Sequence, residues 1–336
     1  MSKGRKAKSG GENQSTPHRW PRVLLGLALV GGLIVAAFHF SDLSKFAELA
    51  KEAKPGWLLL AVGIQLITYP IQSEVWRAMA RAGKKRLGVW TAIRLSLAKL
   101  FVDQSLPTGG VTGTITVSKA LEKEGIPDEV ATATVVVYTI SNQAVFVVSL
   151  AVGLIIALVE GQVPKVILIG SAVGTGIGLL VMAGALVLSR ERSGKTRRLA
   201  ERIPPLRSLI KELSEADPKL TRKFGLLMQT GVYQFIVLVL DAATLWVLLK
   251  AVGVTGSPAG VYASFVFSNV FHSIGIIPGG LGVFEAASVL SLRLSGVSLA
   301  AAISGTLMYR ILTFWLPMIP SWVVARSVLK SAGRKG

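Results

Sequence analysis

Long apolar stretches constrain the fold of this chain more than any other feature. A helix that crosses a hydrocarbon core of about 30 Å needs roughly 20 predominantly apolar residues. Six segments meet this requirement, and each is predicted to cross a membrane once. They are residues 23–40, 57–76, 130–159, 166–188, 224–249 and 299–328.

The composition favours a membrane protein over a basic soluble protein. The 336 residues are 51% hydrophobic and 16% charged, whereas an ordinary soluble domain is about 25% charged. Lys and Arg total 37 against 18 Asp and Glu, which gives a net charge of +19, and the mean hydropathy is +0.57. A soluble nucleic-acid-binding protein of this charge would have a negative hydropathy. We therefore assign the positive charge to cytoplasmic loops and expect no nucleic-acid partner.

The chain has no cysteine, and its three histidines are scattered along the sequence. Disulfides, thiolate metal sites and cysteine nucleophiles are excluded. We expect no metal site and no cofactor.

Two further apolar segments, 89–121 and 259–294, are each interrupted near the middle. Irregular backbone at membrane depth is tolerated only where protein or a water-filled cavity surrounds it. The interruptions are therefore candidate functional elements. Both are rich in Pro and Gly, and they contain Pro107, Gly109, Pro278, Gly279 and Gly280.

The distribution of Lys and Arg orients the chain in the membrane. The basic segments 1–22, 77–86, 190–223 and 326–335 are predicted to face the cytoplasm, while the charge-balanced segment 41–56 faces outward. Phe38, His39 and Phe40 do not form a small-residue cleavage site, so segment 23–40 is predicted to be a retained signal-anchor. Both termini are then cytoplasmic, in a bacterial inner membrane.

This orientation requires each broken segment to cross the membrane an even number of times. Each segment is therefore either two full spans or one re-entrant hairpin. The halves are short, only 18 residues for 89–106 and 12 for 283–294, so we favour re-entrant hairpins with their Pro-Gly breaks at mid-membrane.

A weak internal repeat accompanies the broken segments. Shifting the sequence by 171 positions aligns both breaks and also superimposes identical residues after them, including Tyr138 on Tyr309. The expected fold is all-α: a polytopic bundle of about six spans plus two re-entrant hairpins, arranged as an inverted repeat. Its alternative is two Gly/Pro kinks in an ordinary bundle. We predict a disordered tail over 1–20 and one membrane domain over 21–330, with repeat halves 57–159 and 224–328 and a linker 190–223.

Ionisable residues inside the spans are candidate functional groups, because burying them in a membrane is costly. Asp241, Glu285 and Arg310 have similar estimated depths, so we expect Arg310 to lie beside one of the two carboxylates. The cluster is either a closed structural ion pair or part of a headgroup or proton site. Glu285 also follows the second break, where a carboxylate caps a helix N-terminus. His272 is a weaker candidate, with a packing role as its alternative.

The first broken segment carries a second group of candidates. Lys99 and Asp103 are four residues apart and so share one helix face. Thr112 adds a hydroxyl just after the break. A cavity lined in this way would suit a phosphate-bearing headgroup. The alternative is that Lys99 and Arg94 extend their charged ends to the membrane interface.

Two motifs resemble a known family. The segment 278–286, Pro-Gly-Gly-Leu-Gly-Val-Phe-Glu-Ala, and the segment 309–317, which begins Tyr309-Arg310, are similar to the lysylphosphatidylglycerol synthase transmembrane-region family, also called flippase-like. The first break departs from the family pattern, because Val111 stands where an acid is usual. In bifunctional members this region precedes an aminoacyl-transferase domain, and stand-alone members are associated with moving isoprenoid, hopanoid or glycolipid species. The resemblance implies translocation without the synthetic activity.

Three hypotheses follow for the function. The leading one is a lipid translocase, not an enzyme, that moves a phospholipid, isoprenoid lipid or glycolipid across the bacterial inner membrane. The second is a non-catalytic membrane partner of a lipid-synthesis enzyme, and the third is an intramembrane lipid transferase using Asp103, Glu285 or His272. The expected partners are membrane lipids with an anionic headgroup, together with a second copy of the chain or a lipid-synthesis enzyme.

Overall fold

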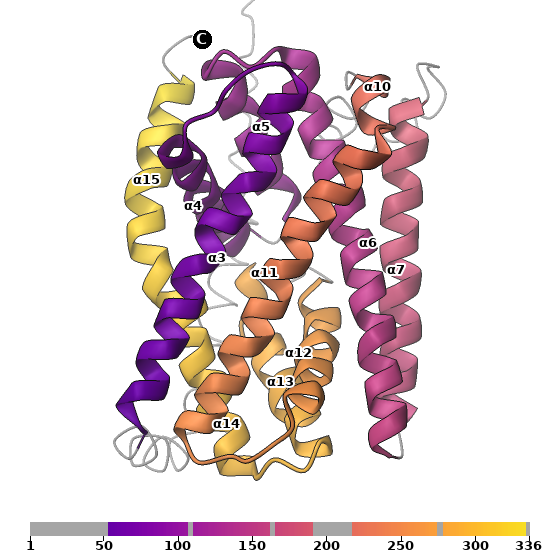
Figure 1. Ribbon diagram of the computed structural model, residues 1–336, viewed down its shortest axis with the longest axis vertical. Coiled ribbons are helices and arrows are strands. Elements are labelled where there is room, and N and C mark those ends of the chain that lie inside the picture. The colour runs from indigo at the N-terminus through magenta and orange to yellow at the C-terminus, as the bar shows by residue number, and fades with distance from the viewer. Residues whose placement is uncertain (1–52, 107–109, 162–164, 191–216, 274–277, 334–336) are drawn as a thin grey trace, which may run out of the picture.

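The computed structural model describes residues 53–106, 110–161, 165–190, 217–273 and 278–333. The predicted tail 1–20, the predicted signal-anchor 23–40 and most of the linker 190–223 lie outside these ranges. Within them, all regular secondary structure is helical, which confirms an all-α membrane protein (Figure 1).

Five helical segments are long and apolar enough to cross a membrane, and they coincide with the five predicted spans in the described ranges. Four are single helices, and the fifth is a continuous run of α-helix, π-helix and α-helix. They are α3 (Pro55–Ala82), α6 (Asp128–Glu160), α7 (Lys165–Arg190), α11 (Phe224–Ala251), and the run α14 (Leu299–Arg310), η2 (Ile311–Trp315) and α15 (Leu316–Gly333). A short helix, α10 (Pro218–Thr221), precedes α11.

The two broken segments form pairs of short helices. The first pair is α4 (Val89–Ser105) and α5 (Val111–Lys123); the second is α12 (Pro258–Ser273) and α13 (Val283–Leu294), joined through the 3-10 turn η1 (Pro278–Gly280). The helices have 12 to 17 residues, or roughly 18–26 Å at 1.5 Å per residue, too short to cross a core of about 30 Å. The pairs lie at opposite ends of the bundle (Figure 1), as expected for re-entrant hairpins.

The helix boundaries recur along the chain. Helices α3 and α11 both have 28 residues, and their starts are 169 positions apart, as are those of α4 and α12. Helices α6 and α14, which follow the hairpins, start 171 positions apart. Counted from the start of its first helix to the start of the span that follows, the second hairpin is therefore two residues longer than the first.

The two hairpins also end in the same way. Gly125 after α5 and Gly296 after α13 have φ of +80° and +84°, the left-handed conformation that glycine adopts most readily. In each turn the residue after the glycine donates its backbone N–H to the carbonyl of Leu121 or Leu292, at 3.1 and 3.0 Å. Both leucines are fully buried, one in each of the two hydrophobic cores.

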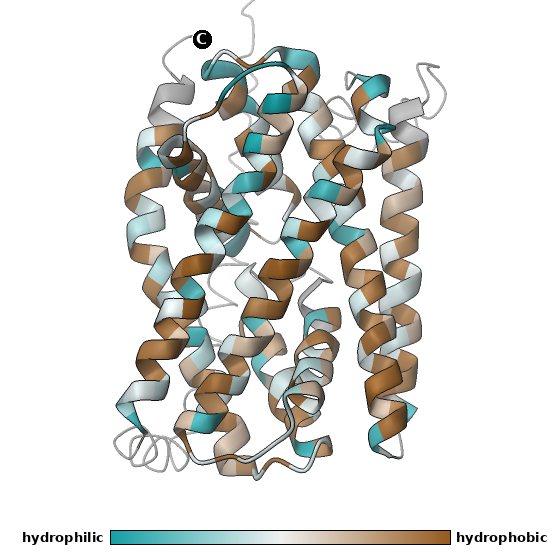
Figure 2. Ribbon diagram, viewed as in Figure 1, coloured by the Kyte–Doolittle hydropathy of each residue, from teal (hydrophilic) through white to brown (hydrophobic). Residues whose placement is uncertain are grey.

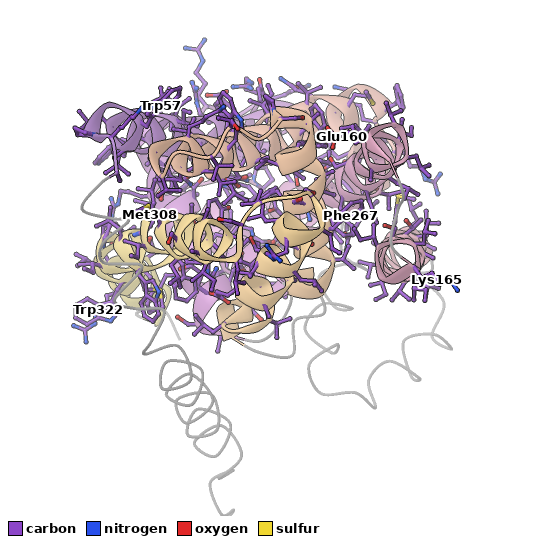
Figure 3. All side chains as sticks on the ribbon, turned by 90° about the horizontal axis from the view of Figure 1, so that it is seen from below. Trp57, Glu160, Lys165, Phe267, Met308 and Trp322 are labelled. Atoms are coloured by element: carbon purple, nitrogen blue, oxygen red, sulfur yellow. The ribbon has the colours of Figure 1, made fainter. Side chains whose placement is uncertain are left out.

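Large apolar side chains cover the outside of the bundle. Leu59, Leu66 and Leu180 are 61–73% exposed, and the middle of α6, α7 and α11 is strongly hydrophobic, while hydrophilic residues gather where α5 ends and α10 begins (Figure 2). In the view along the bundle, Trp322 and Lys165 lie at the rim (Figure 3). Apolar side chains that face outward in this way are expected where lipid surrounds a protein.

Helices α4 and α5 cross closely at Gly113, in the first turn of α5. A Cβ at this position would lie 2.0 Å from Asp103 Oδ1 and 2.9 Å from the Lys99 carbonyl oxygen. The carboxylate therefore occupies the space that a side chain would need. The crossing explains why a glycine stands inside this helix despite its low helix propensity.

We expect Gly113→Ala to lower the free energy of unfolding by about 1–3 kcal/mol, the usual cost of overpacking. The matched control is Gly184→Ala on α7, where a Cβ meets nothing within 4 Å; there alanine should raise helix stability by about 0.5–1 kcal/mol. Thermal unfolding of the two purified variants measures both effects. Equal melting temperatures would contradict the close crossing.

Candidate functional site

A cavity of about 360 Å³ lies between the two hairpins and the helices that flank them. Lys99 is ten residues into α4 and Arg310 is eleven residues into α14, so both lie roughly 15 Å along helices that start at opposite ends of the bundle. The cavity is therefore at mid-depth. Its polar lining comprises Gln65, Thr68, Tyr69, Gln72, Ser96, Lys99, Asp103, Gln104, Tyr138, Asp241, Asn269, Tyr309, Arg310 and Thr313.

Arg310 connects α14 to the second hairpin. Its Nε donates to Glu285 Oε1 at 2.6 Å, and its Nη2 donates to the Gly279 carbonyl at 2.8 Å. The guanidinium also lies over the Phe314 ring, 4.2 Å from the centroid. Its side chain is 8% exposed. The prediction that Arg310 lies beside one of the two carboxylates is confirmed, with Glu285 as the partner.

Glu285 has a second role at the same place. Its Oε2 accepts the backbone N–H of Gly282 at 2.7 Å, which caps the start of α13. The expected capping of the helix N-terminus and the expected ion pair therefore both occur, one at each carboxylate oxygen. An anionic group is also favoured there by the helix dipole.

The two hairpins meet beside the π-helix η2, next to the break between the two helices of each hairpin. A Cβ at Gly279, whose φ is +60°, would lie 2.2 Å from Phe314 Cε2 and 3.2 Å from the Gln104 carbonyl oxygen. The Gln104 side-chain amide donates to the Thr313 carbonyl at 3.4 Å. Only glycine fits between the Phe314 ring and the end of α4. π-Helical turns are frequent at functional sites, and this one carries Thr313 and Phe314 into the cavity wall.

Lys99 and Asp103 form the second charged pair. Lys99 Nζ lies 2.5 Å from Asp103 Oδ2 and 4.6 Å from the Tyr138 ring centroid. The lysine residue is only 8% exposed, so its ammonium lies within the bundle and does not reach the interface. Arg94, by contrast, is exposed and donates to Ser327 Oγ. The alternative of a charged end at the interface therefore applies to Arg94 and not to Lys99.

The structure brings six of the predicted site residues together around the cavity. They are Lys99, Asp103, Asp241, Gly279, Tyr309 and Arg310.

The remaining predicted residues lie elsewhere or are not described. Glu285 stands behind Arg310, and Gly280 and Thr112 are outside the lining. Pro107 and Gly109 lie outside the described residues. His272 and Pro278 belong to α12 and η1, but the positions of their side chains are not described.

The sequence did not single out the neutral polar lining. Gln65, Gln72 and Gln104 are amides in helices at membrane depth, and Asn269 lies in the second hairpin. Buried side-chain amides in apolar helices are themselves costly, so they could have been identified in the same way as the charges. Tyr138 was noted as the repeat partner of Tyr309, and both tyrosines face the cavity.

The arrangement suits noncovalent recognition of a polar group. Amides, hydroxyls and two cations can donate hydrogen bonds to phosphate oxygens. Asp103 and Glu285, two of the candidate transferase residues, are both engaged in ion pairs. Among the described residues, no group of three or more His, Cys, Asp or Glu is placed to hold a metal ion.

Two comparisons with known proteins bear on this site. A family model described as the lysylphosphatidylglycerol synthase TM region matches residues 23–321. A UPF0104 membrane protein of Pyrococcus horikoshii is 22% identical over 324 residues, covering 88% of this chain and 93% of its own length.

We expect Arg310→Ala to destabilise the protein by about 3–5 kcal/mol, because it leaves Glu285 and the Gly279 carbonyl without their partner in the membrane core. Arg81→Ala is the control: Arg81 is 44% exposed and pairs with Glu74 at 3.3 Å, and exposed pairs contribute about 0–1 kcal/mol. Thermal unfolding in detergent compares the two. Adding Glu285→Ala to Arg310→Ala should cost less than Glu285→Ala alone; additive costs would contradict a coupled pair.

Proposed function

The chain belongs to the lysylphosphatidylglycerol synthase transmembrane-region family, and from this premise we propose that it moves a membrane lipid from one leaflet to the other. The observation that carries the proposal is the polar cavity at mid-depth between the two hairpins. During translocation a lipid's acyl chains can stay in the hydrocarbon core of the bilayer, whereas its headgroup needs a polar path across that core. The cavity offers hydrogen-bonding groups where the bilayer has none.

The arrangement of the hairpins suggests how the cavity opens to each side in turn. We interpret the recurring helix boundaries and the opposite placement of the hairpins as an inverted repeat, an architecture that many transporters use for alternating access. Tyr138 and Tyr309 are equivalent in this repeat, and each lies beside a cation of the lining, Lys99 or Arg310. Each half thus contributes an aromatic residue and a charged pair.

The hydrogen-bond donors of the lining suit an anionic headgroup such as a phosphate ester. Lys99 and Arg310 supply a cation from each half, and amides and hydroxyls surround them. A volume of about 360 Å³ is within the usual range for small-molecule sites. We therefore propose a phospholipid, an isoprenoid phosphate or a glycolipid as the substrate, translocated without covalent change.

The charge distribution supports a cytoplasmic location for one end of the bundle. Arg77, Arg81, Lys84, Lys85 and Arg86 cluster where α3 ends, and positive charge is enriched on the cytoplasmic side. We propose that this end of the bundle faces the cytoplasm of an inner membrane, so that the α4–α5 hairpin enters from inside and the α12–α13 hairpin from outside.

Lipid translocation by the purified protein in proteoliposomes tests the function. We expect Lys99→Gln and Glu285→Gln to slow translocation at unchanged fold, and Lys99→Gln to affect an anionic lipid more than a zwitterionic one, because a fixed cation's attraction scales with ligand charge. Lys119→Gln is the control, since Lys119 is exposed on α5.

The outcomes separate the three hypotheses. No translocation by the wild-type protein alone contradicts the proposal and favours a partner protein. A change in the mass of the labelled lipid indicates a transferase. Normal rates in both variants assign Lys99 and Glu285 a structural role.

Labelling of single cysteines tests the orientation, since the chain has none of its own. An impermeant maleimide added to intact cells should label Thr255→Cys, between α11 and α12, and leave Glu124→Cys, after α5, unlabelled until the membrane is opened. Both positions are exposed. The reverse pattern would contradict the proposed orientation.

A further inference from the structure

Asp241 lies in the middle of α11 and contributes a carboxylate to the cavity. It is ten residues from the end of α11 at Ala251, which is roughly 15 Å along the helix. The Gln65 side chain from α3 faces it, and the Tyr69 and Tyr309 hydroxyls are close enough to interact with it electrostatically. All four residues line the same cavity.

The charges around the cavity are unequally matched. Lys99 pairs with Asp103 at 2.5 Å, and Arg310 pairs with Glu285 at 2.6 Å. Within the described part of the chain, Asp241 forms no ion pair with a lysine or arginine. When all these groups are ionised, the cavity therefore has one carboxylate in excess.

The helices packed against α11 supply few positive charges to offset the carboxylate of Asp241. Helix α3 presents Tyr69 and Gln65, and α14 presents Tyr309 together with Arg310, whose guanidinium is already held by Glu285 and Gly279. Helix α6 presents Tyr138, and α12 presents the neutral Phe265 and Asn269, while the side chain of His272 lies outside the described residues. Across the cavity, α4 contributes Lys99 already paired with Asp103.

An ionised carboxylate without a counter-cation is costly in a membrane core, and such groups neutralise instead. Binding one proton removes the charge. It also removes the repulsion between Asp241 and an anionic headgroup in the same cavity. Proton binding and headgroup binding therefore favour each other, as two ligands of one site must when each stabilises the other.

We propose that Asp241 is a proton-binding site that couples proton movement to lipid translocation. This proposal rests on the proposed function and adds its energy source. A carboxylate oxygen of Asp241 takes a proton from water on one side, the anionic headgroup enters the neutralised cavity, and the proton leaves to water on the other side when the headgroup does. One proton and one headgroup of charge −1 move together, so the step is electroneutral.

A pH gradient across proteoliposomes tests the coupling. The probe is phosphatidylglycerol with a fluorescent label on one acyl chain, and its distribution between leaflets is read by quenching the outer pool. For one proton per lipid, each pH unit should shift the steady-state ratio between leaflets about tenfold. A membrane potential or a sodium gradient imposed without a pH gradient should leave the ratio unchanged.

Whatever the rate of translocation in Asp241→Asn, the leaflet ratio that this variant approaches under the same pH gradient should be near one, because the amide binds no proton. Glu160→Gln is the matched control: Glu160 is an exposed carboxylate at the end of α6 that accepts from the Ser257 hydroxyl at 2.9 Å. This variant should keep the wild-type response. A wild-type ratio unaffected by the pH gradient, or a full response in Asp241→Asn, would overturn the coupling.

A second readout is independent of transport. Infrared difference spectra of the purified protein, recorded between acidic and alkaline pH, should contain a protonated-carboxyl C=O band that is absent in Asp241→Asn and present in Glu160→Gln. If that band is found but the wild-type protein moves no lipid, the proposed function fails while the proton site stands. If lipid moves but neither the band nor the gradient response depends on Asp241, the proton proposal fails.

Discussion

The contact of Arg310 with Glu285 and the Gly279 carbonyl fixes the end of a helical hairpin in the middle of the bundle. A chain that ends a helix at this depth leaves backbone N–H and C=O groups where no lipid can satisfy them. Glu285 accepts a hydrogen bond from the Gly282 N–H. Arg310 donates to the Gly279 carbonyl and forms an ion pair with the Glu285 carboxylate. The first hairpin uses a related device, with the Asp103 carboxylate against the first turn of α5 and Lys99 as its counter-cation. The cavity exists because both hairpins can end at mid-depth.

Much of this architecture follows from the sequence, because an apolar segment in a bilayer forms a helix and its length decides whether that helix can cross. Hydropathy and length identified the five described spans, and the short halves on either side of each Pro-Gly break favoured re-entrant hairpins over two full crossings. Helix periodicity placed Lys99 beside Asp103, and estimated depth placed Arg310 beside a carboxylate.

The choice of Glu285 over Asp241 was not predictable, because it depends on the rotation of α11 and α13 about their axes. The neutral lining from Gln65, Gln72 and Asn269 was missed for a similar reason: one amide in an apolar helix does not reveal which way it points.

The pairing of charges gives the cavity its character. Lys99 with Asp103 and Arg310 with Glu285 form ion pairs that hold the two hairpins. Asp241 adds a further carboxylate to the same cavity. Groups that stabilise the fold and a group that is free to change its charge thus share one space. The contacts among Gly279, Phe314 and Gln104, next to a π-helical turn, form the junction of the two hairpins at the same level. A rearrangement of that junction would change access to the cavity from both sides, which is what alternating access requires.

Photocrosslinking from within the cavity tests most directly whether a lipid headgroup enters it. A diazirine amino acid at Gln72, which lines the cavity on α3, is compared with one at Leu66, which is 61% exposed on the outer surface of the same helix. The adducts are then fragmented by tandem mass spectrometry. We predict headgroup-linked lipid adducts at position 72 and acyl-chain adducts at position 66. Acyl-chain adducts at position 66 together with no lipid at position 72 would contradict a headgroup path through the cavity.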